Sequence, residues 1–200
     1  MQLYFIPFAC SLAARIVAEE AGLALDYVPV DQAKRLPDGS DFRAINPLGY
    51  VPVLIDQGRV LMEAPVVLEH LADRAGRGDL AGGEDRAGVR QWLHFVATEL
   101  HQLSFHPIMA ADATDGSRAW GRAQGAARLA WLDPLLATRE TLLDTFTIAD
   151  AYLLAVLNWA ETAGYDLARY PGVLAWRTRM RRRPSVARAA AAELPLLRAA

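Results

Sequence analysis

The sequence predicts two domains, a small α/β domain with a mixed β-sheet followed by an all-helical domain. Strand-like runs rich in branched and aromatic residues are confined to the part of the chain before residue 63. Helical periodicity dominates from residue 85 onward, and the glycine-rich stretch RAGRGDLAGGE separates the two parts. We therefore expect an α/β domain at 1–76, a linker at 77–83 and a helical domain at 84–200.

The α/β domain has the predicted element order βαβαββα. The expected strands cover 2–6, 25–31, 51–56 and 59–62, the expected helices cover 11–21 and about 63–75, and a short helical turn falls within DFRAINPLG. A two-residue turn at Gln57-Gly58 joins the last two strands, so these must be antiparallel. The βαβ unit before them implies parallel pairing, and the sheet is therefore expected to be mixed.

The second domain contains only helical patterns. They cover 85–109, 118–138, 147–163, 171–182 and 185–198. Thr147 and Asp150 have the spacing of a capping box, in which each side chain satisfies a backbone N–H at the start of a helix. We expect these two residues to stabilise the fold.

The composition excludes several classes of function. The 200 residues carry a formal net charge of −2, whereas nucleic acids and anionic membranes call for an excess of Lys and Arg. A single cysteine cannot form an intramolecular disulfide, and the Cys and His residues have no zinc-site spacing, so no metal is expected. No transmembrane segment or secretion signal is predicted. We expect a cytoplasmic protein that binds small molecules.

That single cysteine, Cys10, falls where the first helix begins. Unpaired backbone N–H groups and the helix dipole favour an anion at such a position. We therefore expect the pKa of the thiol to be lowered, which suits a nucleophile or a thiol-binding group. The alternative is that Cys10 is a small buried hydrophobe.

Two further features lie at the ends of neighbouring elements. A proline follows Val51 at a strand, where it removes a backbone donor. From the residues alone we expect a trans proline at a strand start; a cis bond would instead leave the Val51 backbone free to pair with an extended peptide. Glu63-Ala64-Pro65 has the composition of a helix start, and the N–H groups there can bind a carboxylate.

Several motifs together resemble the glutathione transferases, and most closely their bacterial beta class. They are ACSLA at 9–13, AINPLGYVP at 44–52, LME at 61–63, ATELH at 97–101 and FTIADAY at 146–152. The resemblance spans nearly the whole chain. It implies a thioredoxin-like N-terminal domain, an all-α C-terminal domain and glutathione as co-substrate.

The resemblance also implies roles for individual residues. Cys10 and His101 would be catalytic, at the glutathione sulfur. The other implied glutathione-binding residues are Arg35, Val51, Pro52, Glu63, Ala64, His94 and Thr98, and the electrophile pocket would contain Phe8, Phe105, His106, Met109 and Trp159. Either Lys34 or Arg35 would reach the glycyl carboxylate. Trp159 has core packing as its alternative role.

The helix around 85–104 carries two candidate histidines. On a regular α-helix, Arg90, His94, Ala97 and His101 share one face. His106, just before Pro107, is a rival to His101, but only His101 completes the Glu-Leu-His triplet of the family pattern. The helix after His101 is one residue longer than in that pattern. The pocket wall that it forms with Phe105, His106, Ile108 and Met109 is therefore expected to be distinctive.

We therefore predict a glutathione transferase that conjugates reduced glutathione to small hydrophobic electrophiles and functions as a homodimer. Two alternatives remain open at this point. One is glutathione-dependent thiol-disulfide exchange through a mixed disulfide on Cys10. The other is a binding module that has the fold without turnover.

Overall fold

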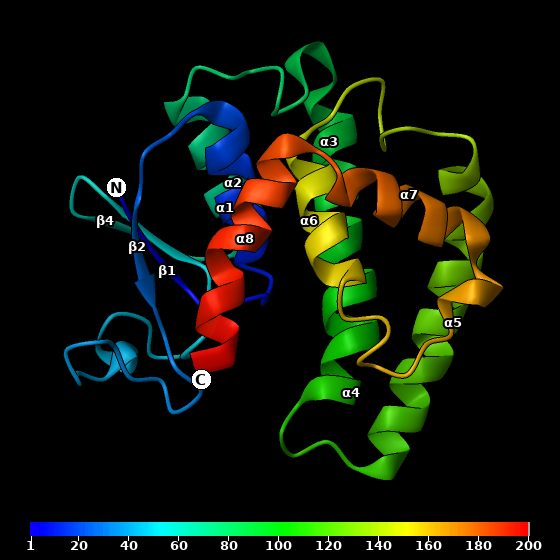
Figure 1. Ribbon diagram of the computed structural model, residues 1–200, viewed down its shortest axis with the longest axis horizontal. Coiled ribbons are helices and arrows are strands. Elements are labelled where there is room, and N and C mark those ends of the chain that lie inside the picture. Colours follow the sequence, from blue (N-terminus) through cyan, green and yellow to red (C-terminus); the bar gives the residue numbers. More distant parts are fainter. Residues whose placement is uncertain (200) are drawn as a thin grey trace.

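The computed structural model describes residues 1–199, with side chains for residues 1–197; Ala200, the last residue of the predicted helical domain, lies outside the described residues. The N-terminal part contains β1 (Gln2–Phe5), α1 (Leu12–Ala21), β2 (Asp26–Pro29), a 3₁₀ turn (Phe42–Ala44), β3 (Val53–Asp56), β4 (Arg59–Leu61) and α2 (Ala64–Arg74). The C-terminal part contains α3 (Arg86–Phe95), a π-helix (Val96–Phe105), α4 (His106–Met109), α5 (Asp115–Ala137), α6 (Ile148–Leu157), α7 (Pro171–Arg181) and α8 (Pro184–Ala199), with 3₁₀ turns at Gly83–Asp85 and Leu167–Arg169. Figure 1 shows the sheet on one side and α3 to α7 on the other.

The sheet is mixed, as predicted, with the strand order β2-β1-β3-β4. β1 pairs with β2 in parallel and with β3 antiparallel, so that Leu3 lies between Tyr27 and Leu54. β4 returns antiparallel to β3 after the tight turn. Both pairing directions inferred from connection lengths are confirmed.

Alternating residues of the strands face two different cores, because side chains of a strand point to opposite faces in turn. Leu3 and Leu54 are fully buried in the larger core, which extends through α1 and α2 to the helical part of the molecule. Tyr4 and Val53 face a smaller cluster with Phe42, whose ring centroid lies 5.6 Å from that of Tyr4. The predicted helical turn between β2 and β3 thus covers one face of the sheet.

Helix α6 runs through the centre of the helical part, and each of its ten residues is buried. The predicted capping box at its start is confirmed. The Asp150 carboxylate accepts hydrogen bonds from the Thr147 N–H and the Leu142 N–H, both at 2.8 Å, and from the Thr147 hydroxyl at 3.1 Å. Burial raises the pKa of Asp150 to about 6, although these hydrogen bonds act in the opposite direction.

The helix predicted over 85–109 is interrupted. α3 ends at Phe95, and the next ten residues form a π-helix, in which hydrogen bonds join residues five apart. Pro107 accounts for a break near the end of the π-helix and not for its start at Val96, because its ring would collide with the carbonyl four residues earlier and it has no N–H to donate. Gly121 lets α5 approach closely, since a Cβ there would lie 2.8 Å from the Ser104 carbonyl oxygen.

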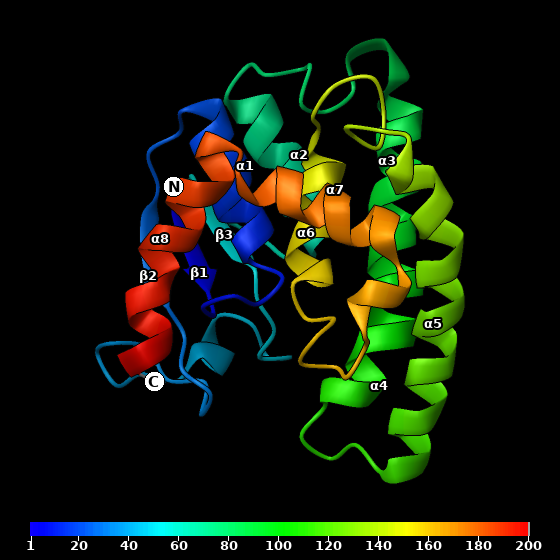
Figure 2. The ribbon, with the colours of Figure 1, turned by 45° about the vertical axis from the view of Figure 1, so that its right-hand side comes forward.

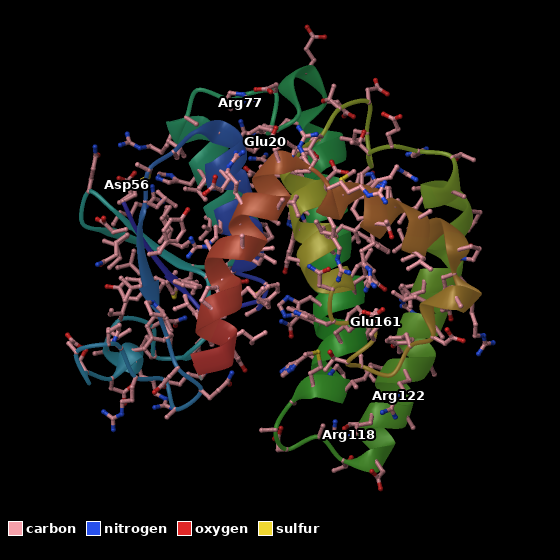
Figure 3. The ribbon with its side chains drawn as sticks, in the orientation of Figure 1. Glu20, Asp56, Arg77, Arg118, Arg122 and Glu161 are labelled. Carbon is pink, nitrogen blue, oxygen red and sulfur yellow. The ribbon has the colours of Figure 1, made fainter. Side chains whose placement is uncertain are left out.

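Helix α8 returns to the N-terminal part and lies along α1 (Figures 1 and 2). Ion pairs join α1 to α8 and to the residue before it: Glu19 with Arg188 at 2.8 Å and Arg15 with Glu193 at 3.0 Å on the two helices, and Glu20 with Arg183, just before α8, at 2.5 Å. Glu20 also lies near Arg77 of the linker, whose guanidinium donates to the Glu20 carbonyl at 3.1 Å (Figure 3). None of the helices described is both long and apolar enough to cross a membrane.

Candidate active site

A cavity of about 420 Å³ lies between the sheet and the helical part of the chain. From the N-terminal part it is lined by Ile6, Ala9, Cys10, Lys34, Asn46, Leu48, Tyr50, Val51, Pro52, Met62, Glu63 and Ala64. From the helical part it is lined by Ala97, His101, Gln102, Phe105, His106, Met109, Ala110, Tyr152 and Trp159. The cavity therefore combines a polar, backbone-rich wall with a largely apolar one.

Cys10 precedes α1 and is 7% exposed. Its thiol donates a hydrogen bond to the Val51 carbonyl at 3.1 Å. The predicted lowering of its pKa is wrong: burial raises the pKa of Cys10 to about 12, outweighing the backbone N–H groups of Ser11 and Cys10 that act in the other direction. Cys10 thus enters the site as a protonated hydrogen-bond donor.

The Val51-Pro52 peptide bond is cis, so the trans bond expected from the residues alone is wrong. Val51 precedes β3 and is half-buried at the cavity wall. Within residues 1–199 no group accepts a hydrogen bond from its N–H. The Val51 backbone therefore offers a free donor beside the Cys10 thiol.

Glu63 stands immediately before α2 and has a left-handed backbone, with φ of 67°. A residue with a Cβ seldom adopts that conformation, at a cost of about 1–2 kcal/mol, and such residues cluster at ligand sites. Ala64 and Pro65 form the first turn of α2, so the free Ala64 N–H at the helix start is available to an anion. A carboxylate acceptor and a carboxylate-binding helix end lie side by side here.

His101 projects from the π-helix and meets Tyr152 of α6. The Nδ1 atom of His101 lies 2.9 Å from the Tyr152 hydroxyl, and its ring centroid is 5.0 Å from that of Trp159. Burial, with a smaller effect of His106, lowers the pKa of His101 to about 4. His101 is therefore neutral at physiological pH. Burial also raises the pKa of Tyr152, whose hydroxyl keeps its proton.

The loop before Cys10 is held from the helical part. Trp159 donates from Nε1 to the Phe8 carbonyl at 2.9 Å, and Glu193 of α8 accepts from the Phe8 N–H at 2.7 Å. Phe8 has a left-handed backbone, with φ of 56°. These bonds connect Cys10 to elements more than 140 residues later in the chain.

The cavity gathers most of the predicted site residues. Those that line it are Cys10, Val51, Pro52, Glu63, Ala64, His101, Phe105, His106, Met109 and Trp159. Four predicted residues do not line it: Phe8, Arg35, His94 and Thr98. Arg35 instead donates to the Gly39 carbonyl at 3.3 Å, and Lys34 lines the cavity in its place. His94 bonds the Arg90 carbonyl at 2.7 Å. Its predicted place in the cavity assumed one regular helical face shared with His101, and the change to a π-helix after Phe95 ends that face.

Sequence reasoning missed several lining residues, among them Asn46 and Tyr152. The Asn46 side chain accepts from the Leu48 N–H at 3.1 Å and donates to the Tyr50 carbonyl at 2.8 Å, so it shapes the loop that reaches Val51. The Asn-Pro pair at 46–47 is a turn signal that could have identified it. Tyr152 is the last residue of the FTIADAY motif, but nothing in the neighbouring sequence indicates a contact with His101.

No cluster of three or more metal-ligating side chains occurs among the described residues.

Comparisons with known proteins give consistent results. Residues 9–74 match the family model for the glutathione S-transferase N-terminal domain, and residues 101–184 match that for the C-terminal domain. The glutathione S-transferase GstA of Escherichia coli O157:H7 is 36% identical over 96% of this chain and 98% of its own.

Two solved structures cover the same 96% of the chain and 98% of their own. A sphingomonad glutathione S-transferase complexed with glutathione has 36% identity and a TM-score of 0.90. A bacterial beta class glutathione S-transferase from Sphingomonas chungbukensis has 35% identity and a TM-score of 0.90.

Proposed function

Because the chain belongs to the glutathione S-transferase family and is a glutathione transferase, we propose that it conjugates reduced glutathione to small hydrophobic electrophiles, with the glutathione sulfur between Cys10 and His101. The observation that carries this proposal is the single cavity that has both residues, a free Val51 N–H and the start of α2 on its walls. Its apolar helical wall suits a hydrophobic second substrate. Conjugation of such compounds would serve detoxification.

The polar wall supports an orientation for glutathione. Glu63 would accept from the ammonium of the γ-glutamyl group, while the Ala64 N–H would bind its carboxylate. The Val51 backbone would pair with the cysteinyl residue, as in an added strand. Lys34, which lines the cavity, would bind the glycyl carboxylate in preference to Arg35, which does not.

Two neutral donors would then stabilise the glutathione thiolate. The Tyr152 hydroxyl keeps its proton and, within the described chain, has only His101 Nδ1 as a partner. In the proposed arrangement it would donate to Nδ1, which would leave the ring hydrogen of neutral His101 on Nε2. His101 Nε2–H would donate to the sulfur, and the Cys10 S–H would turn from the Val51 carbonyl, which accepts it in the free protein, to donate there too, while the glutathione thiol proton leaves to solvent. The thiolate then attacks the electrophilic carbon.

Thiol-disulfide exchange through Cys10 has a specific observation against it. With a pKa of about 12, Cys10 would be ionised to about one part in 10⁵ at pH 7 in the free protein. The thiolate is the attacking species in exchange, so conjugation is the better-supported reaction.

Titration calorimetry with reduced glutathione and an ultraviolet titration of the bound thiol test the proposal. We expect one glutathione per chain and a thiol pKa below that of free glutathione. Cys10→Ala should retain conjugation of 1-chloro-2,4-dinitrobenzene with a raised thiol pKa, whereas exchange with 2-hydroxyethyl disulfide would need Cys10. Absence of glutathione binding would refute the proposal, and disulfide turnover that exceeds conjugation and disappears in Cys10→Ala would favour the alternative.

We further propose a homodimer and a cytoplasmic location. Exposed apolar side chains support the dimer: Leu48 is 70% exposed, Tyr50 61% and Trp131 53%. The Trp131 ring also packs on Phe95, with centroids 5.1 Å apart, which would present a rigid aromatic surface. Sedimentation equilibrium of the chain and of Trp131→Arg would test the dimer. The location follows from the co-substrate, since the cytosol keeps thiols reduced.

A further inference from the structure

The π-helix places a second histidine on the same side of the helix as His101. The His106 N–H donates to the His101 carbonyl, so the two residues are one turn apart. On a regular α-helix, residues five apart would be separated by about 140° around the axis. The irregular turn therefore brings both imidazoles to the cavity, and both line it.

The His106 ring has no hydrogen-bond partner among the described residues, in contrast to the ring of His101. His106, Gln102 and Ala110 also line a second cavity of about 330 Å³ that adjoins the first. The ring is half-buried. An imidazole carries at least one N–H in either protonation state, so His106 always offers a donor to a molecule in these cavities.

The backbone that follows His106 is hydrogen-bonded to α5. Arg118 donates to the Ile108 carbonyl, and the Ser117 hydroxyl shares its hydrogen between the carbonyls of Thr114 at 2.9 Å and Pro107 at 3.2 Å. Figure 3 shows Arg118 on α5 near α4. The donor on His106 is thus held by a rigid element, as a group that acts in catalysis must be.

We propose that His106 donates a hydrogen bond to the carbonyl oxygen of the second substrate, and that the preferred electrophiles are α,β-unsaturated carbonyl compounds. This rests on the proposed function. When the glutathione thiolate forms a bond to the β-carbon, the electron pair of the C=C bond moves toward the carbonyl oxygen. That oxygen lies three bonds from the attacked carbon, and His106, which lines the same cavity as His101, would donate to it. The enolate then takes a proton from water, which balances the proton lost by the thiol.

A halide substrate makes no such demand on His106. The halide departs from the attacked carbon itself, and no negative oxygen forms at a distance from the sulfur. An unsaturated ketone and a benzyl halide of similar size and polarity therefore distinguish a donor role of His106 from a purely steric one.

The test compares trans-4-phenyl-3-buten-2-one with 4-nitrobenzyl chloride in the parent chain, His106→Phe and His106→Gln. We expect His106→Phe to lower kcat/KM for the ketone about 100-fold, the usual effect of one lost donor to an oxyanion. The change for the chloride, which reports only the altered shape of the pocket, should be at least about tenfold smaller. His106→Gln, which retains an N–H donor, should recover most of the ketone activity. Glutathione binding by calorimetry and thermal unfolding should stay close to the parent.

Three results would overturn the proposal: equal losses for the two substrates, no loss for the ketone, or a parent chain that turns over the chloride and not the ketone. If His106→Phe does not fold, His106→Leu provides the same contrast with His106→Gln. Failure of the proposed function is a different result, because the parent would then neither bind glutathione nor turn over either substrate.

Discussion

The two walls of the cavity are built in different ways. The N-terminal wall presents main-chain groups and helix ends: the Val51 backbone, the start of α2 and the loop before α1. The helical wall presents side chains: His101 on the π-helix, His106 at the start of α4, and Trp159, whose ring packs against that of His101. Backbone groups fixed by a sheet suit a constant ligand, here glutathione. Side chains on a helix with an altered register can suit a different second substrate.

The same contrast applies to the titratable groups. Cys10 of the N-terminal wall and His101 of the helical wall are both held neutral by burial, the first with a raised pKa and the second with a lowered one. Each can donate a hydrogen bond, and neither carries charge near neutral pH. Cys10 and His101 would thus face the glutathione sulfur without adding a charge of their own.

The largest expected effect concerns Cys10. Below a pKa of about 12, the thiolate fraction rises tenfold per pH unit, so the rate of alkylation by iodoacetamide in the ligand-free protein should rise about a thousandfold from pH 7 to pH 10. Free glutathione is the reference, because its rate levels off as its own thiol ionises. The chain has one cysteine, so mass spectrometry reports this site alone. A rate independent of pH above 7 would show that the helix end dominates over burial.

The second effect concerns glutathione affinity at the N-terminal wall. Glu63→Gln should weaken binding about 100-fold, since it leaves the buried ammonium of the ligand without a charged partner. Glu69→Gln is the matched control, because Glu69 lies on α2, the helix that Glu63 precedes, and pairs with Arg86 and Arg90 away from the cavity. Calorimetric titration measures both. Equal losses in the two variants would mean that net charge, and not the position of Glu63, sets the affinity.

The third effect concerns stability against pH at the helical wall. The pKa of His101 is about 4 in the folded chain and about 6.5 when unfolded, so the unfolded state binds more protons between these values. The free energy of unfolding should therefore fall as pH drops from 6.5 to 4, by up to about 3 kcal/mol from this residue. Urea unfolding of the parent and of His101→Gln should give curves that diverge above pH 4.

The difference between those two curves is the informative quantity. Asp150, with its pKa raised to about 6, makes the opposite contribution, because stability from that group increases as pH falls through 6. Both proteins contain Asp150, so its effect cancels. Parallel curves would show that His101 is as accessible to protons in the folded chain as in the unfolded one.

The sequence predicted residues of both walls, through motifs that resemble a family. Val51 and Glu63 also have local signals, since each stands next to a proline or a helix start, but the cis bond at Pro52 did not follow from them. The pKa of Cys10 could not be predicted, since its burial depends on packing with later elements. Pro107 predicts a disturbed helix but not its new register, so neither the position of His94 nor that of His106 followed from helical periodicity. Long-range bonds, such as that from Phe8 to Glu193, leave no local pattern.

The smallest expected effect tests whether a residue behind the helical wall acts through His101. Tyr152→Phe removes the hydroxyl that bonds Nδ1, and with it the donor that would keep the ring hydrogen on Nε2 in the proposed tautomer. A neutral hydrogen bond contributes about 1 kcal/mol, so we expect kcat to fall about fivefold, with KM for glutathione unchanged and the pH midpoint of activity raised by less than about one unit. Tyr165→Phe is the control, because the Tyr165 hydroxyl donates to the Gly121 carbonyl at 3.2 Å, outside the cavity. If both variants lose only stability, with no shift of the pH profile, Tyr152 is a packing residue. The helical wall would then hold His101 by packing alone and not through a hydrogen bond from behind.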